Sequence, residues 1–224
     1  DIALDAINKQ SVKLLDDLRD ELETDYSPMV ISGCIGPRSD GYNPDFFMSI
    51  EEAKKYHATQ IKSFNESSAD MVTAMTITYV EEAIGIVKAA KAENIPVVIS
   101  FTVETDGHLP SGQSLKDAID QVDDATDSAP AYYMINCAHP EHFKNELVGD
   151  GRWLSRIHGI RANASKKSHA ELDECEELDD GNPEELGEAY GAFSKNLKQL
   201  NVFGGCCGTD HRHVDAICKV TMAA

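Results

Sequence analysis

Short apolar runs recur along this chain, and amphipathic segments long enough to be helices lie between most of them. The apolar runs cover residues 29–32, 71–75, 97–102, 132–136, 158–162 and 202–203. Helical periodicity covers residues 11–22, 50–65, 80–93, 115–125 and 184–197. Strands that are apolar throughout and alternate with helices are typical of a parallel sheet with helices packed against it. The sequence therefore predicts an α/β fold.

The positions of the polar and thiol side chains favour a closed barrel over a doubly wound sheet. They follow the ends of several different apolar runs, as functional residues do at the C-terminal rim of a TIM (β/α)8 barrel. No GxGxxG phosphate-binding motif supports the doubly wound alternative. The chain has six strand-like runs, whereas such a barrel has eight. We therefore expect one barrel domain over residues 1–224, with its first one or two βα units missing from this sequence.

Three cysteines occupy positions that suit a metal site. Cys206 and Cys207 follow the last apolar run and have glycines on both sides, and Cys137 follows the end of another run. Neighbouring cysteines cannot comfortably bond each other, and the glycines let the backbone wrap closely around an ion. Three thiolates at strand ends would form a zinc site whose fourth position stays open. The alternative is that they are buried apolar side chains, as free cysteines commonly are.

Charge and hydropathy exclude several classes of partner. Phosphate binding needs clustered lysine and arginine, so a chain with a net charge of −19 is not expected to bind nucleic acid. No apolar run approaches a membrane span and the N-terminus has no signal-like segment, so no membrane partner is expected. Six cysteines without a CxxC pair favour the reducing cytoplasm, where disulfides are not expected.

Four motifs give the chain a resemblance to the homocysteine S-methyltransferase family. Residues 204–209 read GGCCGT, similar to the family's GGCC signature after the last strand. Residues 136–140 read NCAHP, similar to its Asn-Cys-x-x-Pro after the sixth strand. The turn SGCIGP at residues 32–37 and the run SFT at residues 100–102 also match. Order and spacing agree over essentially the whole chain.

This resemblance implies a barrel enzyme of methionine biosynthesis that transfers a methyl group to homocysteine. It also implies that Cys137, Cys206 and Cys207 are the Zn²⁺ ligands and so the catalytic residues. A thiol bound to zinc is deprotonated, whereas a free thiol is mostly protonated at neutral pH. The expected partners are a small-molecule thiol and a methyl donor, and association into homo-oligomers is left open. The residues expected to line the substrate site are Gly36, Pro37, Ser100, Asn136 and Asn163.

Two departures from the family concern the acceptor. The family's Asp-Gly-Gly turn after its first strand, which also helps bind the amino acid, is absent from the sequence shown. The family has a glutamate at the end of its fourth strand that holds the amino group of homocysteine, and the alignment places Met75 there. A thioether cannot replace that carboxylate. Separately, the segment after the seventh strand departs from the family, with Arg161 and Ala162 where many relatives have Tyr-Pro, before the matching Asn163. The alternatives are methylation of a different thiol, or a zinc- or thiol-binding homologue without catalysis.

Other candidates receive mainly structural interpretations. His211 and His213 could shuttle protons, but a helix start capped by Asp210 is favoured. Cys34 is expected in the turn after its strand, lining the pocket. The polar segment 165–182 is interpreted as a loop with a short helix and not as a site.

Overall fold

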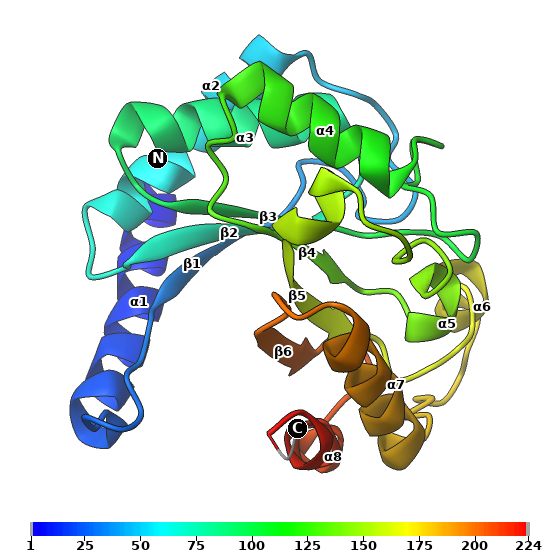
Figure 1. The fold of residues 1–224 in the computed structure, drawn as a ribbon. Helices are drawn as coiled ribbons and strands as arrows, with labels where there is room; N and C mark the ends of the chain where they lie inside the picture. The colour runs from blue at the N-terminus through cyan, green and yellow to red at the C-terminus, as the bar shows by residue number, and fades with distance from the viewer. Residues whose placement is uncertain (1, 223–224) are drawn as a thin grey trace.

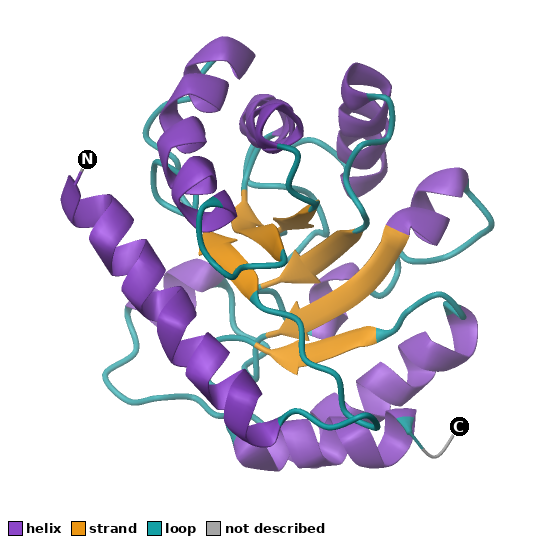
Figure 2. Cartoon of the chain, turned by 90° about the vertical axis from the view of Figure 1, so that its left-hand side faces the viewer, coloured by secondary structure: helices purple, strands orange, loops and turns teal. Residues whose placement is uncertain are grey.

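The computed structural model describes residues 2–222, and its six β-strands form one parallel sheet. Each strand pairs with the next along the chain, in the order β1-β2-β3-β4-β5-β6. The sheet is curled, and helices cover its outer face (Figures 1 and 2). The predicted α/β fold is confirmed, and over the described residues it forms a curled half-barrel. The strands are Ser32–Ile35 (β1), Met71–Ile77 (β2), Val97–Phe101 (β3), Tyr133–Asn136 (β4), Ile157–Ala162 (β5) and Val202–Gly205 (β6).

The helices begin where the sequence provides capping residues. Ser49 and Glu52 form a reciprocal capping box at the start of α2, and Asn182 caps α7 with a proline at its first position. No described helix has the length and hydropathy that crossing a membrane requires. The helices are α1 (Ile2–Leu22), α2 (Ile50–Asn65), α3 (Val80–Glu93), α4 (Leu115–Thr126), α5 (Pro140–Phe143), the 3-10 helix η1 (Arg152–Arg156), α6 (His169–Asp173), α7 (Pro183–Asn196) and α8 (His211–Thr221).

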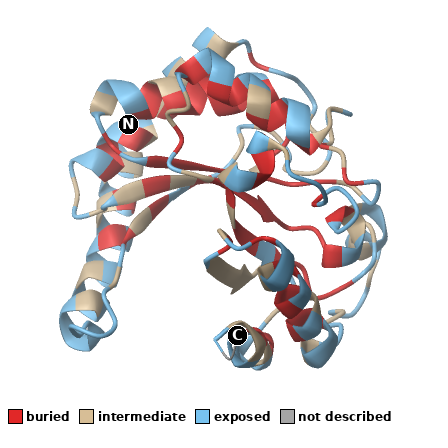
Figure 3. Ribbon diagram, in the orientation of Figure 1, coloured by how far each residue is buried: buried red, intermediate tan, exposed pale blue. Residues whose placement is uncertain are grey.

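The core lies between the sheet and its helices (Figure 3). Every residue of β3 and β4 is buried, which explains why these strands are apolar without alternation. Phe101 and Tyr133 stack on neighbouring strands with ring centroids 6.2 Å apart. Full burial of one such side chain contributes roughly 1.5–3 kcal/mol. The centre of the sheet is therefore the most strongly buried part of the fold.

The first two strands alternate in burial because one of their faces is turned away from the helices. On β2, Val72 and Ala74 are buried, whereas Thr73 and Met75 are only partly buried. On β1 the same alternation leaves Cys34 exposed. The inner, concave face of the sheet therefore presents side chains to an open hollow.

The first strand and the first helix differ most from the sequence prediction. The first strand was expected at residues 29–32 but runs over Ser32–Ile35, because the amides of Met29 and Ile31 donate to the carboxylates of Glu23 and Asp70. Cys34 therefore lies within the strand and not in the following turn. The first helix was expected from residue 11 but begins at Ile2, and its N-terminal half is held to α2 by the hydrogen bond from Ser63 to Asp5.

Candidate active site

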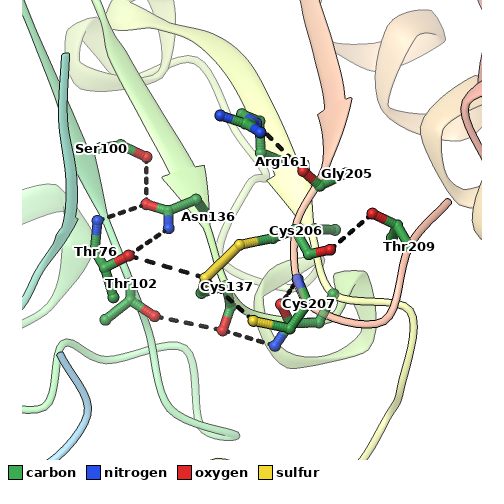
Figure 4. The surroundings of a disulfide bond; sticks show 12 residues. Thr76, Ser100, Thr102, Asn136, Cys137, Arg161, Gly205, Cys206, Cys207 and Thr209 are labelled. Carbon is green, nitrogen blue, oxygen red and sulfur yellow. Dashed lines mark hydrogen bonds between the residues drawn. A yellow bond between two sulfur atoms is a disulfide. The ribbon is translucent and has the colours of Figure 1, made fainter. Parts of the chain in front are cut away.

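The C-terminal ends of β4 and β6 bring three cysteine sulfurs together (Figure 4). The Sγ atoms of Cys137, Cys206 and Cys207 all lie within 4.8 Å of one another. Cys137 and Cys206 are joined by a disulfide, and the Sγ of Cys207 lies 3.9 Å from that of Cys137. The expectation that the chain has no disulfide is therefore wrong for this structure. Because thiolates are the metal-binding form of cysteine, this bond must be reduced before all three can bind a metal.

Glycines and unusual backbone angles shape the two turns that carry the sulfurs. A side chain at Gly205 would place its Cβ 2.1 Å from the Oγ1 of Thr209, and Gly208 has a φ of +77°. Cys137 and Thr76 also adopt left-handed backbone angles, with φ of 54° and 60°. Such angles cost of order 1–3 kcal/mol in residues with a Cβ, and they concentrate at functional sites.

Asn136 and Ser100, both expected to line the substrate site, form a buried hydrogen-bond network beside Cys137. The amide oxygen of Asn136 accepts from the Oγ of Ser100 at 2.6 Å and from the backbone amide of Thr76 at 2.9 Å. Its amide nitrogen donates to the Oγ1 of Thr76 at 2.8 Å. That hydroxyl in turn lies 3.9 Å from the Sγ of Cys137. The network holds Thr76, which the sequence analysis missed, against the sulfur.

Asn163, which was expected to line the substrate site, links the two cysteine-bearing turns. Its side-chain nitrogen donates to the carbonyl of Cys137 at 3.0 Å, and its side-chain oxygen accepts from the amide of Cys207 at 3.1 Å. The side chain is buried. One amide group therefore sets the distance between the segments that follow β4 and β6.

Two ring side chains, Tyr42 and His169, lie beside the cysteine cluster, and the sequence analysis assigned neither of them to the site. The hydroxyl of Tyr42 is 3.8 Å from the Sγ of Cys207, and burial, followed by the neighbouring Cys207, raises the pKa of Tyr42. The ring of His169 lies 4.0 Å from that of Tyr42, and its Nε2 donates to the carbonyl of Cys137 at 2.6 Å. The short helix expected in segment 165–182 is confirmed as α6, but this segment does contribute a residue to the site.

The loop after β1 begins with Gly36 and Pro37 and continues to Tyr42. No hydrogen bond joins either of these two residues to the cysteines, so the loop approaches the sulfurs through Tyr42. Cys34 is outside the cysteine cluster and lines a cavity on the inner face of the sheet. Although Cys34 is exposed on the inner face of the sheet, partial desolvation within this cavity raises the pKa of its thiol.

A negatively charged cavity of about 610 Å³ lies at the rim beside Tyr42 and His169. Carboxylates at one wall attract cations and repel anions. The cavity therefore offers a positively charged group a place beside Tyr42, whose hydroxyl lies 3.8 Å from the Sγ of Cys207. Its acidic lining residues are Asp40, Asp45, Glu104 and Asp173.

The histidines that follow the double cysteine have structural positions. Asp210 caps α8, and His213 is fully buried, with its Nδ1 accepting from the amide of Asp210 and its Nε2 donating to the carbonyl of Asp180. His211 is exposed at the start of α8. The helix start capped by Asp210 is therefore confirmed.

Comparisons with known proteins agree with this architecture. A family model described as homocysteine S-methyltransferase matches residues 2–221. The metallated form of the homocysteine methyltransferase MmuM from Escherichia coli has a TM-score of 0.72 and 16% identity, over 98% of this chain and 71% of that one. Its apo form has a TM-score of 0.71 and 17% identity, over 95% and 73%. Its oxidized form has a TM-score of 0.71 and 17% identity, over 95% and 70%.

These structural similarities concern the fold, because the identities are low. The family match covers nearly every residue of the chain, including the turns that carry the three cysteines. The resemblance to the family is confirmed. The chain therefore belongs to the homocysteine S-methyltransferase family and is a methyltransferase.

Proposed function

We propose that this protein is a zinc-dependent methyltransferase whose acceptor is a thiol, with homocysteine as the first candidate and methionine as its product. The observation that carries the proposal is the approach of three sulfurs to within 4.8 Å of one another. Soft thiolate ligands suit zinc, and three of them leave one coordination position for a substrate. The donor set therefore fits the metal that the family resemblance implies.

Zinc bound by the three cysteines would keep the acceptor sulfur deprotonated at neutral pH. In the transfer, an electron pair of that sulfur forms the new bond to the methyl carbon, and the bond from this carbon to the donor atom breaks with its electrons left on the donor. Asn163 would hold the two turns at the spacing that metal binding needs. Tyr42 and His169 would limit the access of water from the rim.

The acidic rim cavity supports a positively charged methyl donor, such as a sulfonium or a quaternary ammonium compound. Carboxylates stabilise a cation, and this stabilisation is lost when the donor becomes neutral after transfer, which favours its release. A position for Gly36 and Pro37 in substrate binding belongs to the same proposal, through the loop that carries Tyr42. We also propose that the six strands are part of a complete (β/α)8 barrel.

A second candidate is a zinc- or thiol-binding protein without catalysis, or with a different thiol as acceptor. Met75 favours it, because this side chain lines the hollow where a carboxylate would be needed for the amino group of homocysteine. The two candidates make different predictions for methyl transfer and the same prediction for zinc.

The test is the zinc content and methyl transfer of the reduced protein, compared with the variants Cys206→Ser and Cys218→Ser. Cys218 is exposed on α8, away from the cluster, and is the matched control. We expect one zinc per chain and methylation of homocysteine from a sulfonium or quaternary ammonium donor, with both lost only in Cys206→Ser. Zinc without methylation of homocysteine would support the second candidate, and the absence of zinc from the reduced protein would refute both.

A further inference from the structure

The inner face of the sheet contains a cavity of about 250 Å³ with one charged side chain in its wall. That side chain is Arg161 of β5. Met75 and Met134 form apolar walls, Cys34 adds a thiol, and the remaining lining residues are serine, threonine, tyrosine, methionine and valine. A single cation in an otherwise uncharged cavity favours a ligand with one negative charge.

Arg161 differs from the other described arginines in its contacts. Although acidic residues outnumber basic ones by 39 to 20 in this chain, no carboxylate of the described residues lies within ion-pair distance of Arg161. Its one protein hydrogen bond runs from Nε to the carbonyl of Gly205 at 3.3 Å. Arg161 is exposed, and its terminal nitrogens have no hydrogen-bond acceptor among the described residues, so their N–H groups are accessible to a ligand. Every other described arginine has a carboxylate or aromatic partner: Arg19, Arg38, Arg152, Arg156 and Arg212.

The register of the sheet places Arg161 beside the cysteine cluster. On one side it pairs with Asn136, which precedes Cys137, and on the other with Gly204, two residues before Cys206. Its side chain lies over Gly204, where a Cβ would come within 3.4 Å of its Cγ and Nε. Figure 4 shows the guanidinium beside β6 and the sulfurs farther along the same strand ends. Arg161 therefore lies on the strand between the two strands that lead into the cysteine-bearing turns.

Met75 reaches the same place from the opposite side of the hollow. It directly precedes Thr76, whose hydroxyl lies 3.9 Å from the Sγ of Cys137. A thioether packs well against methylene groups but cannot balance an ammonium charge. An ammonium group here would face a methionine and a guanidinium, and like charges repel.

We propose that Arg161 selects the acceptor, which is a short aliphatic thiol with a carboxylate or sulfonate group and no need for an amino group. This inference rests on the proposed function and assigns its substrate class. The guanidinium binds the anionic group through paired N–H donors, and the methionines contact the carbon chain. Homocysteine would then bind through its carboxylate, and its ammonium group would weaken the binding.

Three thiols that differ by one group test the proposal by calorimetric titration of the reduced, zinc-loaded protein. They are homocysteine, 4-mercaptobutyrate, which lacks its amino group, and 3-aminopropanethiol, which lacks its carboxylate. We expect 4-mercaptobutyrate to bind at least about tenfold more tightly than 3-aminopropanethiol, because a hydrogen-bonded charge pair is at stake. Arg161→Gln should remove this preference, and Arg161→Lys should retain part of it.

Arg152→Gln is the matched control, because Arg152 is exposed on the outer side at η1 and its removal should change no affinity. Equal binding of the two thiols by the wild type, or an unchanged preference in Arg161→Gln, would overturn the proposal. A titration with butyrate, which has no sulfur, separates this failure from that of the proposed function. If the protein binds no zinc but still binds butyrate, and this binding is lost in Arg161→Gln, the anion site is supported and the proposed function is not. If the protein binds zinc and methylates a thiol but Arg161→Gln changes neither binding nor preference, the proposed function is supported and the anion site is not.

Discussion

One buried hydroxyl group joins β5 to β6, the strand that leads into Cys206 and Cys207. Tyr190 of α7 is fully buried, and its hydroxyl donates to the carbonyl of Gly204 at 2.6 Å and accepts from the amide of Ala162 at 2.9 Å. Burial raises the pKa of Tyr190, so the hydroxyl stays protonated. Tyr190 of α7 thus connects β5 to β6 at Gly204, two residues before Cys206.

The substitution Tyr190→Phe isolates the contribution of this hydroxyl. The ring and its packing remain, while the two short hydrogen bonds to the backbone are lost, together with a longer contact at 3.3 Å to the carbonyl of Ile160. At about 1 kcal/mol for each bond, we expect the free energy of unfolding to fall by about 2 kcal/mol. Urea unfolding of the reduced protein, followed by circular dichroism, measures this difference. Tyr26→Phe is the control, because Tyr26 is 99% exposed.

A loss below about 0.5 kcal/mol in Tyr190→Phe would refute this reasoning, since it is smaller than the usual net contribution of even one hydrogen bond. We also expect weaker zinc binding in this variant, because β5 and β6 determine where Cys206 lies relative to Cys137. Tyr26→Phe should bind zinc as the wild type does. A chelator competition measures both affinities.

Three further predictions concern the surroundings of the site. Burial raises the pKa of Tyr79 to about 12, while a tyrosine in the unfolded chain ionises near pH 10. The contribution of this raised pKa to the free energy of unfolding is therefore complete below pH ~10 and is lost as the pH rises toward 12. In Tyr79→Phe, the free energy of unfolding should fall less over this pH range. Urea unfolding at a series of pH values measures the difference. Asn163→Ala should weaken zinc binding about tenfold or more in a chelator competition, because it releases both cysteine turns, whereas Asn201→Ala, at an exposed position before β6, should not. Gly205→Ala should lower both the thermal unfolding temperature and the zinc content, because its Cβ would lie 2.1 Å from a threonine oxygen. Gly36→Ala is the control: its Cβ would meet no atom within 4 Å, so the unfolding temperature should not change.

Much of the fold could be predicted because burial on both faces leaves a strong signal. The strands at residues 97–101 and 133–136 are buried at every position, so their apolar character marks them without alternation. The first strand was placed too early because Met29 and Ile31 are apolar, yet their amides bind carboxylates instead of a neighbouring strand. That competition depends on Glu23 and Asp70, and no local pattern indicates it.

The cysteines of the site could be found from the sequence because they follow the ends of apolar runs, and because the glycines beside Cys206 and Cys207 indicate a tight turn. Tyr42, Thr76 and His169 could not, because their contacts join segments that are distant along the chain. Tyr42 and Thr76 contact cysteine sulfurs, and His169 contacts the carbonyl of Cys137. Thr76 depends on a left-handed backbone angle, which a β-branched residue rarely adopts. His169 lies in a polar segment whose composition resembles an ordinary surface loop. The roles of these residues in substrate binding stay predictions.

The distance between the cysteines along the chain has a consequence for the order of assembly. Cys137 and Cys206 are 69 residues apart, and β5 lies between their strands. Closing so long a loop costs entropy before any bond to a metal is gained. If the cysteines bind a metal as proposed, we expect β4, β5 and β6 to pair before the metal binds, unlike small zinc fingers, in which the ion drives folding. Maturation would then be a late loading step on a preassembled scaffold, and its rate would depend on zinc supply and on thiol reduction in the cell.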